Sequence, residues 1–229
     1  MKKEGYLFGY FVSGNRIFVC IKPAGILSTD EEGGLPGMIR SYLGDAKACV
    51  RTVHRLDRVV SGVMVLARSR EASRILSEQI RGRTFEKEYL AVVHGTALPQ
   101  KGELRDLLLR SREEKKTYVV HELGKDVQEA VLEYEVLEEA EGLSLVRIHL
   151  KTGRTHQIRA QFSSRGWPLV GDKKYGAEDA ERGAIALWSY RLAFSHPQTG
   201  KKVVFSALPA AEPWNQFSSL KTIHHGIEV

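Results

Sequence analysis

The sequence of 229 residues contains little cysteine and no long apolar run. Cys20 and Cys49 are the only cysteines and do not form a Cys-x-x-Cys pair, so neither a disulfide framework nor a cysteine-based zinc site has support. No segment approaches the roughly twenty apolar residues of a membrane span. The first five residues, MKKEG, lack the apolar core of a signal peptide. These absences predict a cytoplasmic protein.

Composition leaves two classes of protein open. The hydrophobic content of 42% is sufficient for a packed core, and the formal net charge is +6 with a pI near 9.3. A basic surface is compatible with a polyanionic partner, but an ordinary basic enzyme has the same charge balance.

Hydrophobic patterning predicts a single α+β domain over residues 1–229, with a largely antiparallel sheet flanked by helices and loops. The segment after Lys22-Pro23-Ala24-Gly25 is rich in acids and glycine and is expected to form a loop. Helical spacing occurs in residues 71–80, and residues 155–165 are expected to form a helix capped by Thr155. Strands are expected at residues 16–21, 62–67, 88–94, 130–136, 143–150, 186–194 and 202–205.

Asp57 is a single acid among cations in the segment HRLDRVVSG, residues 54–62, which closes with a Ser-Gly turn signal. A carboxylate is ionised at neutral pH, and neighbouring guanidinium groups favour that charged form. It is therefore a poor general acid but an available nucleophile. An aspartate that only caps a turn, or pairs with Arg55 or Arg58, is an equally open interpretation at this point.

A second basic block, KTGRTHQIR at residues 151–159, offers many hydrogen-bond donors. Arg154 and Arg159 are bidentate donors, and the N–H groups at the start of the expected helix favour anions. This block could bind a phosphate or a base edge, or it could be an ordinary polar helix start. Tyr89, beside Lys87, could stack on a base and assist proton transfer, or could simply line the core.

A metal site is not expected. His54, Asp57 and His156 could in principle converge as ligands, but the arginines beside them would oppose a divalent ion. His224 and His225 are expected to belong to a solvated tail.

Five motifs in a fixed order resemble the RluA-type family of RNA pseudouridine synthases. They are Lys22-Pro23-Ala24-Gly25, His54-Arg55-Leu56-Asp57 with Ser61-Gly62, the strand from Lys87 to Gly95, Gly153 to Arg159, and Gly171-Asp172-x-x-Tyr175-Gly176. Val60 and Gln161 stand where the family often has threonine and histidine. The resemblance covers a catalytic domain without the small N-terminal S4-like RNA-binding domain that many relatives carry.

The resemblance implies that uridine in a structured ribosomal or transfer RNA is isomerised to pseudouridine, without cofactor or metal. Asp57 matches the nucleophile, with attack at ribose C1′ or at uracil C6 left open. Tyr89 matches the tyrosine that packs on the target base, Arg159 the arginine that pairs with the aspartate, and Arg55 a side chain that replaces the flipped base. The RNA-contacting residues are expected to be His54, Arg55, Arg58, Lys87, Arg154, His156, Gln157 and Ile158.

Two alternatives accompany this interpretation. A catalytically silent RNA-binding protein or RNA chaperone could use the same basic residues. A nuclease using His54 and His156 lacks a metal site and a clear acid and base pair. The protein is expected to be a monomer, and the sequence does not name the target uridine.

Overall fold

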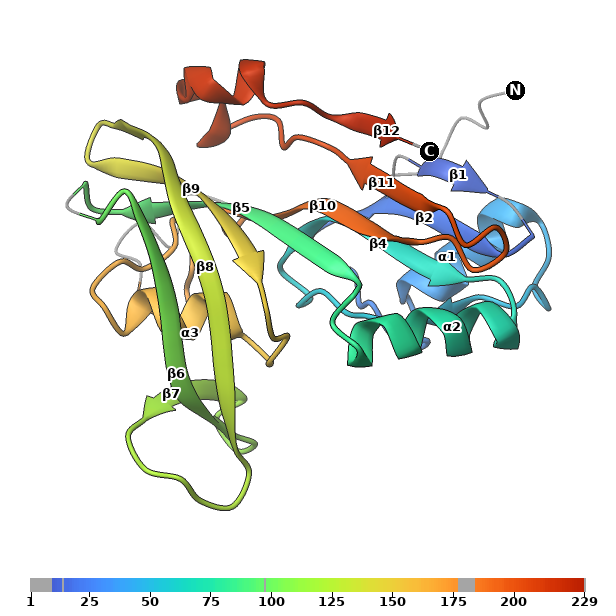
Figure 1. Cartoon of the computed structure of the whole chain (residues 1–229), viewed down its shortest axis with the longest axis horizontal. Coiled ribbons are helices and arrows are strands. Elements are labelled where there is room, and N and C mark those ends of the chain that lie inside the picture. Colours follow the sequence, from blue (N-terminus) through green and yellow to red (C-terminus); the bar gives the residue numbers. More distant parts are fainter. Residues whose placement is uncertain (1–9, 14, 97, 177–183, 229) are drawn as a thin grey trace. The chain divides into compact units, whose positions relative to one another are not determined.

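The computed structural model describes residues 10–13, 15–96, 98–176 and 184–228. They form two compact units, and the chain passes between the two units more than once (Figure 1). The first unit contains the chain up to Lys87, then Trp188–Leu208 and the C-terminal residues from His224, and the second contains Glu88–Leu187 and Pro209–Ile223. That residues 1–229 form a single catalytic domain stays a prediction.

The first unit is built on a mixed sheet. Its strands β1, β2, β4 and β10 lie in that order, and β4 and β10 run parallel while the other neighbours are antiparallel. β11 pairs with β10, β12 with β11, and β3 with β4. The bounds are β1 Tyr10–Ser13, β2 Ile17–Lys22, β3 Arg51–Thr52, β4 Ser61–Ala67, β10 Leu187–Ser195, β11 Lys202–Ser206 and β12 Gly226–Glu228.

Two helices accompany this sheet. α2 (Arg70–Arg81) confirms the predicted helix and begins at Ser69, whose Oγ accepts the N–H of Ala72. Ala72 and Leu76 then pack with alternate residues of β2, β4 and β11 in the core. α1 (Leu35–Leu43) contradicts the predicted loop. The segment looked like a loop because glycines and a proline mark its start, but proline is tolerated in a first helical turn, where its missing N–H is not needed.

The second unit is an antiparallel sheet with the order β5, β9, β8, β6 and β7. The bounds are β5 Glu86–His94, β6 Lys101–Ser111, β7 Lys116–Val120, β8 Val127–Ala140 and β9 Leu143–Leu150. The predicted hairpin of residues 130–136 and 143–150 is confirmed as β8 and β9. The unit also contains the short 3-10 helices η1 Trp214–Gln216 and η2 Ser218–Thr222.

α3 (Gln157–Ser163) lies against β6 and β7 and is shorter than predicted at both ends. The prediction that Thr155 caps it is wrong. The N-cap is His156, with φ 55°, and no side chain caps the helix. An anion site was expected at the N-terminus of this helix. Because α3 has only seven residues, the helix does not support that site.

The strand predicted from Gly62 is confirmed as β4, which also includes Ser61, so the Ser-Gly turn signal does not mark a turn. Gly62 has φ 124°, and a Cβ at this position would lie 2.4 Å from the carbonyl oxygen of Ser189 on β10. A glycine is therefore required by close backbone approach. The turn lies one step earlier, where the N–H of Val60 donates to the carbonyl oxygen of Asp57 at 3.0 Å.

Candidate active site

Asp57 lies half-buried between two residues whose backbones are fixed. On one side, the buried Ser28 hydroxyl accepts the N–H of Leu56 at 3.0 Å and donates to its carbonyl oxygen at 2.8 Å. On the other side, the carbonyl oxygen of Arg58 accepts the N–H of Gly25 at 2.8 Å. The Asp57 loop, residues 54–60, is therefore held by the chain segment that follows β2.

Lys22 ends β2 and is fully buried. Its Nζ donates to three carbonyl oxygens, those of Pro23, Ile26 and Arg58, at 2.9, 2.8 and 3.2 Å. Burial lowers the pKa of Lys22 to about 8, and the charge of Asp57 acts in the opposite direction. Lys22 thus places a cation near Asp57 while tying together the turn at Pro23 and the Asp57 loop.

His54 occupies the core of the first unit. It is 8% exposed, its ring contacts Phe85 at 5.6 Å between centroids, and its Nε2 accepts the N–H of Val65 at 3.2 Å. Burial, aided by the charge of Lys87, lowers the pKa of His54 to about 3, so the imidazole is neutral. Because Nε2 accepts, the ring hydrogen is on Nδ1. The ring is therefore almost inaccessible to RNA.

Arg55, Arg58 and Val59 are exposed around Asp57. The Nε of Arg58 donates to the carbonyl oxygen of Gly25 at 2.8 Å, which orients its guanidinium. Lys87 is half-buried, and burial lowers its pKa. The predicted basic residues of the first unit thus differ in access to solvent, with the two arginines beside Asp57 the most open.

In the second unit, Arg159 is 5% exposed and lies in α3. Its Nε and Nη2 donate to the two carboxylate oxygens of Asp172 at 2.8 and 2.7 Å. The Asp172 side chain is fully buried and also accepts the backbone N–H groups of Lys174 and Tyr175. A bidentate pair of this kind fixes the plane of a guanidinium, so the direction of Arg159 is set by the fold.

Gln157 and Ile158, both buried, serve the fold of the basic block. The Oε1 of Gln157 accepts the N–H of Arg154 and the hydroxyl of Thr152, and its Nε2 donates to the carbonyl oxygen of Val131. The amide is therefore engaged at both ends. Arg154 is half-buried, and its Nε donates to the carbonyl oxygen of Glu129 at 2.9 Å.

Tyr89 belongs to β5 and is 6% exposed, opposite Ile148 of β9. His156 is half-buried, and its Nδ1 lies 3.0 Å from the hydroxyl oxygen of Tyr175. The second unit therefore holds Tyr89 and Arg159 on two different elements, a strand and a helix, both anchored in its core.

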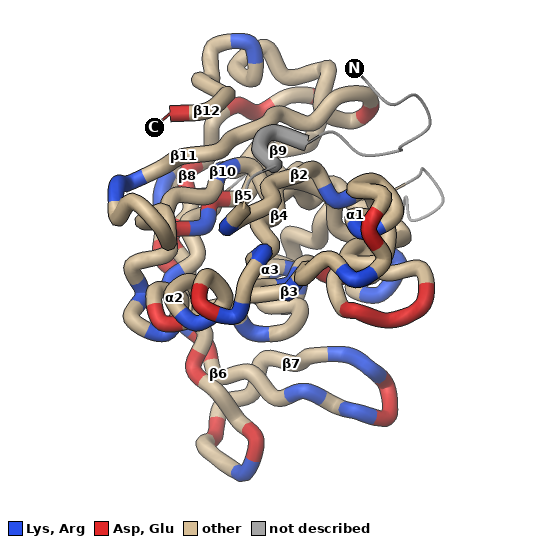
Figure 2. The backbone as a smooth tube through the Cα atoms, turned by 90° about the vertical axis from the view of Figure 1, so that its right-hand side faces the viewer, with Lys and Arg blue, Asp and Glu red and all other residues tan. Residues whose placement is uncertain are grey.

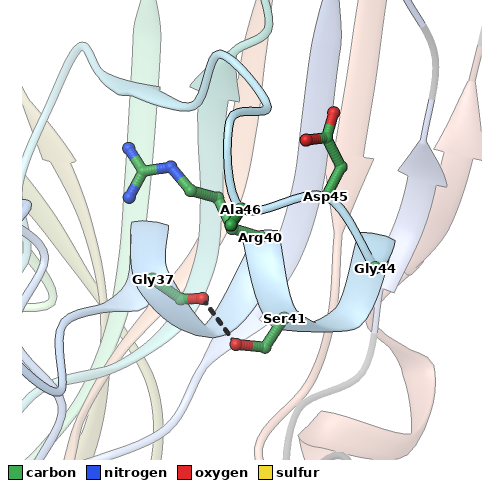
Figure 3. A pocket seen from close by; sticks show the side chains of 6 residues that line it. All are labelled: Gly37, Arg40, Ser41, Gly44, Asp45 and Ala46. Carbon is green, nitrogen blue, oxygen red and sulfur yellow. Dashed lines mark hydrogen bonds between the residues drawn. The ribbon is translucent and has the colours of Figure 1, made fainter.

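The described residues show no cluster of metal ligands at the predicted site. Among the described residues, no three or more His, Cys, Asp or Glu side chains gather as metal ligands. The hollow in Figure 3 lies on α1 and the turn that follows it, which come before the Asp57 loop in the chain. It is lined by Gly37, Arg40, Ser41, Gly44, Asp45 and Ala46, none of them a predicted site residue.

Sequence reasoning missed three supporting residues. Lys22 and Asp172 stood in the quoted motifs without an assigned role, and their presence there was a usable signal. Ser28 gave no signal, because a serine in an acidic loop is ordinary and its contact with Leu56 spans 28 positions of sequence.

Solved structures define the class of this fold. The human RNA pseudouridylate synthase domain containing 4 superposes with a TM-score of 0.75 at 21% identity, covering 96% of this chain and 94% of that one. The human RNA pseudouridylate synthase domain containing 1 gives 0.76 at 21% identity, covering 88% and 83%. At this identity the likeness establishes the fold, which is that of a pseudouridine synthase domain.

Sequence comparisons define the family. A family model described as RNA pseudouridylate synthase matches residues 16–164. The dual-specificity RNA pseudouridine synthase RluA of Escherichia coli (strain K12) is 35% identical over 208 residues, which are 84% of this chain and 89% of that protein. The uncharacterized RNA pseudouridine synthase YhcT of Bacillus subtilis (strain 168) is 34% identical over 201 residues, 84% of this chain and 66% of that protein.

The chain therefore belongs to the RNA pseudouridylate synthase family, as its motifs predicted. It spans between half and two thirds of the length of several of these curated relatives. No helix in the described part of the chain has the length and apolar character of a membrane span.

Proposed function

We propose that this protein isomerises specific uridines of a structured RNA to pseudouridine, with Asp57 as the nucleophile. Family membership supports the reaction class. The single observation that carries the assignment of Asp57 is its setting, a half-buried carboxylate near the buried Lys22 ammonium with a fixed residue on each side. The fixed backbone on each side places the carboxylate, and placement of this kind favours nucleophilic attack.

The reaction balances without a cofactor. An oxygen of Asp57 attacks ribose C1′ or uracil C6, and the C1′–N1 bond breaks. The base turns and C5 bonds to C1′. The bond from Asp57 to C1′ or C6 breaks and returns the free carboxylate, the C5 proton is removed, and N1 gains a proton. Because product and substrate are isomers, no oxidant, reductant or energy source is consumed.

We propose roles for two residues of the second unit. Tyr89 packs on the target base and assists removal of the C5 proton. Arg159, whose Nε and Nη2 are held by Asp172, uses its remaining donors on the carboxylate of Asp57. The proposed pairing of Arg159 with Asp57 would neutralise part of the charge of the active site before RNA binds.

The proposed RNA-contacting set is smaller than the one expected from sequence. Arg55, an exposed arginine of the motif, replaces the flipped base, which costs a few kcal/mol to extract from its stack. Ile158 packs under the target base, and the remaining contacts come from Arg58, Lys87, Arg154 and His156. His54 and Gln157 are left out, because their polar atoms are buried or engaged within the protein.

The RNA is proposed to be ribosomal or transfer RNA, and the protein a cytoplasmic monomer. The RNA class is supported by relatives whose names include a ribosomal large subunit pseudouridine synthase of Buchnera aphidicola and the dual-specificity RluA. The basic pI fits a polyanionic partner, so binding is expected to weaken as salt increases.

The test is to incubate the purified protein with total RNA from a strain that lacks its gene and to map pseudouridines. We expect one or a few new sites with the wild type and none with Asp57→Ala. Asp30→Ala is the matched control, because Asp30 is an exposed aspartate paired with Arg40 on the surface. RNA binding without any new site would support the silent RNA-binding alternative and reject the proposed enzyme.

A further inference from the structure

The motif Gly171-Asp172-x-x-Tyr175-Gly176 resembles that of the family, yet Tyr175 has no role in the function proposed above. Tyr175 is 7% exposed and packs with Leu108, Ala130 and Ala160 in the core of the second unit. Its hydroxyl nevertheless has two polar partners, both in the second unit. The chemistry of these partners determines which nitrogen of His156 carries hydrogen.

The hydroxyl oxygen of Tyr175 accepts the backbone N–H of Thr117 at 2.8 Å and lies 3.0 Å from Nδ1 of His156. An amide N–H can only donate, so the phenol hydrogen is left for the second partner. Donation to His156 requires that Nδ1 carries no hydrogen. A neutral imidazole has one N–H, and it must then be on Nε2.

His156 is held in an unusual backbone conformation. Its φ of 55° lies in the left-handed region, and it forms the N-cap of α3 without a capping side chain. The ring meets the Tyr175 ring edge to face, with centroids 5.7 Å apart and planes at 89°. The hydroxyl and ring of Tyr175 together set the rotation of the imidazole.

Two cations lie over the same tyrosine ring. The Nζ of Lys116 is 5.1 Å from the ring centroid, and the Cζ of Arg159 is 5.0 Å from it. Both are favourable cation–π distances. These contacts hold the Tyr175 ring in place, and with it the hydroxyl that faces His156.

Tyr175 also connects His156 to the turn between β6 and β7. The hydroxyl of Thr117 donates to the carbonyl oxygen of Thr155 at 2.9 Å, and the Nζ of Lys174 donates to the carbonyl oxygens of Glu114 and Lys115. In Figure 2 this turn carries basic residues on both arms and glutamates at its tip. The basic block and β7 are therefore one hydrogen-bonded assembly with Tyr175 at its centre.

We propose that Tyr175 is a positioning residue that holds His156 neutral with its hydrogen on Nε2, so that the ring meets RNA as a hydrogen-bond donor of fixed direction. The role in RNA binding rests on the proposed function. The state of the imidazole does not, because it follows from contacts within the second unit.

The first experiment is a double-mutant cycle of Tyr175→Phe and His156→Gly, with single-turnover rates measured across enzyme concentration. Glycine suits a positive φ, so His156→Gly removes the ring without adding backbone strain. We expect Tyr175→Phe to lower the rate about tenfold and to have no further effect in the His156→Gly background. If the double variant is slower than His156→Gly by the same factor that Tyr175→Phe alone produces, Tyr175 does not act through His156, and the proposal is overturned.

Tyr118→Phe is the matched control, because Tyr118 is an exposed tyrosine of β7, next to Thr117, and its hydroxyl donates to Glu114. Its rate should remain within about twofold of the wild type. Thermal melts establish that each variant is folded at the assay temperature. A loss with Tyr118→Phe equal to that with Tyr175→Phe would contradict the proposed role.

The second experiment uses nitrogen NMR of the imidazole rings, with the His156 signals identified by their loss in His156→Gly. We expect a bare Nδ1 and a protonated Nε2 in the wild type, and a changed Nδ1 shift in Tyr175→Phe. Hydrogen on Nδ1 in the wild type would overturn the inference. If the wild type modifies no RNA, the proposed function fails, while this measurement still decides the state of His156.

Discussion

The loop that carries Asp57 and the block that carries Arg159 are held in opposite ways. In the first unit, Ser28 and Lys22 bind the backbone on either side of Asp57. In the second unit, Asp172 binds the guanidinium of Arg159 itself. Ser28 and Lys22 thus place the backbone of the residue that is proposed to attack, whereas Asp172 orients the guanidinium that is proposed to position it. The difference agrees with the roles proposed for the two residues.

Removing Asp172 should have the largest effect on stability. Asp172→Ala leaves a buried guanidinium without its bidentate partner, so the free energy of unfolding should fall by about 3–5 kcal/mol. Urea denaturation of variant and wild type measures this change. Asp30→Ala breaks a bidentate pair with Arg40 on the surface and should cost about 1 kcal/mol or less. Equal losses in the two variants would mean that burial of the pair between Arg159 and Asp172 does not increase its contribution to stability.

Removing the Ser28 hydroxyl should have a smaller effect on stability. Ser28→Ala leaves the N–H of Leu56 buried without an acceptor, which should cost about 1–3 kcal/mol. Single-turnover activity at a temperature where the variant stays folded should fall as well, because the Asp57 loop loses one of its two supports.

Ser218→Ala is the control for this prediction. Ser218 is exposed and its hydroxyl donates to Glu138, so both stability and activity should remain close to the wild type. Full activity of a folded Ser28→Ala protein would show that the fixed backbone is not needed for the chemistry.

The smallest predicted effect concerns His54 and pH. Its pKa is about 3 in the folded protein and near 6.5 in the unfolded chain, so between these values only the unfolded state binds the proton. Stability is therefore lost as pH falls below 6.5, by about 1 kcal/mol at pH 5.5. His54→Gln should remove this component of the slope between pH 7 and 5, while the exposed His224→Gln should leave it intact. An unchanged slope in His54→Gln would contradict the buried, neutral ring.

The fold could be predicted from sequence where the pattern was periodic and local. β2, β4, β5, β8, β9, β10, β11 and α2 were all predicted within a few residues. α1 was missed because glycines surround a short helix whose stability depends on burying Leu35 and Ile39. β6 and β7 were not predicted, since their alternation is interrupted by charges and becomes clear only when β8 is present as a partner.

The candidate site was also predicted only in part. Asp57, Tyr89 and Arg159 were identified because the motifs keep fixed spacing along the chain. Of their supports, Lys22 and Asp172 stood in the motifs, but Ser28 could not be predicted, because its bond to Leu56 joins residues 28 positions apart. The bond from Thr117 to Tyr175 joins residues 58 apart and could not be predicted for the same reason. The buried position of His54 could not be predicted either. The sequence of a basic motif is the same whether its histidine faces RNA or packs on Phe85.

The central claim, that Asp57 acts in chemistry more than in binding, is tested most directly by Asp57→Asn on an RNA that the wild type modifies. Asparagine keeps the shape of the side chain and removes its charge. Filter binding should give an affinity within about tenfold of the wild type, while pseudouridine formation should be abolished. An asparagine variant that still forms pseudouridine, or one that binds RNA far more weakly than this, would contradict the account.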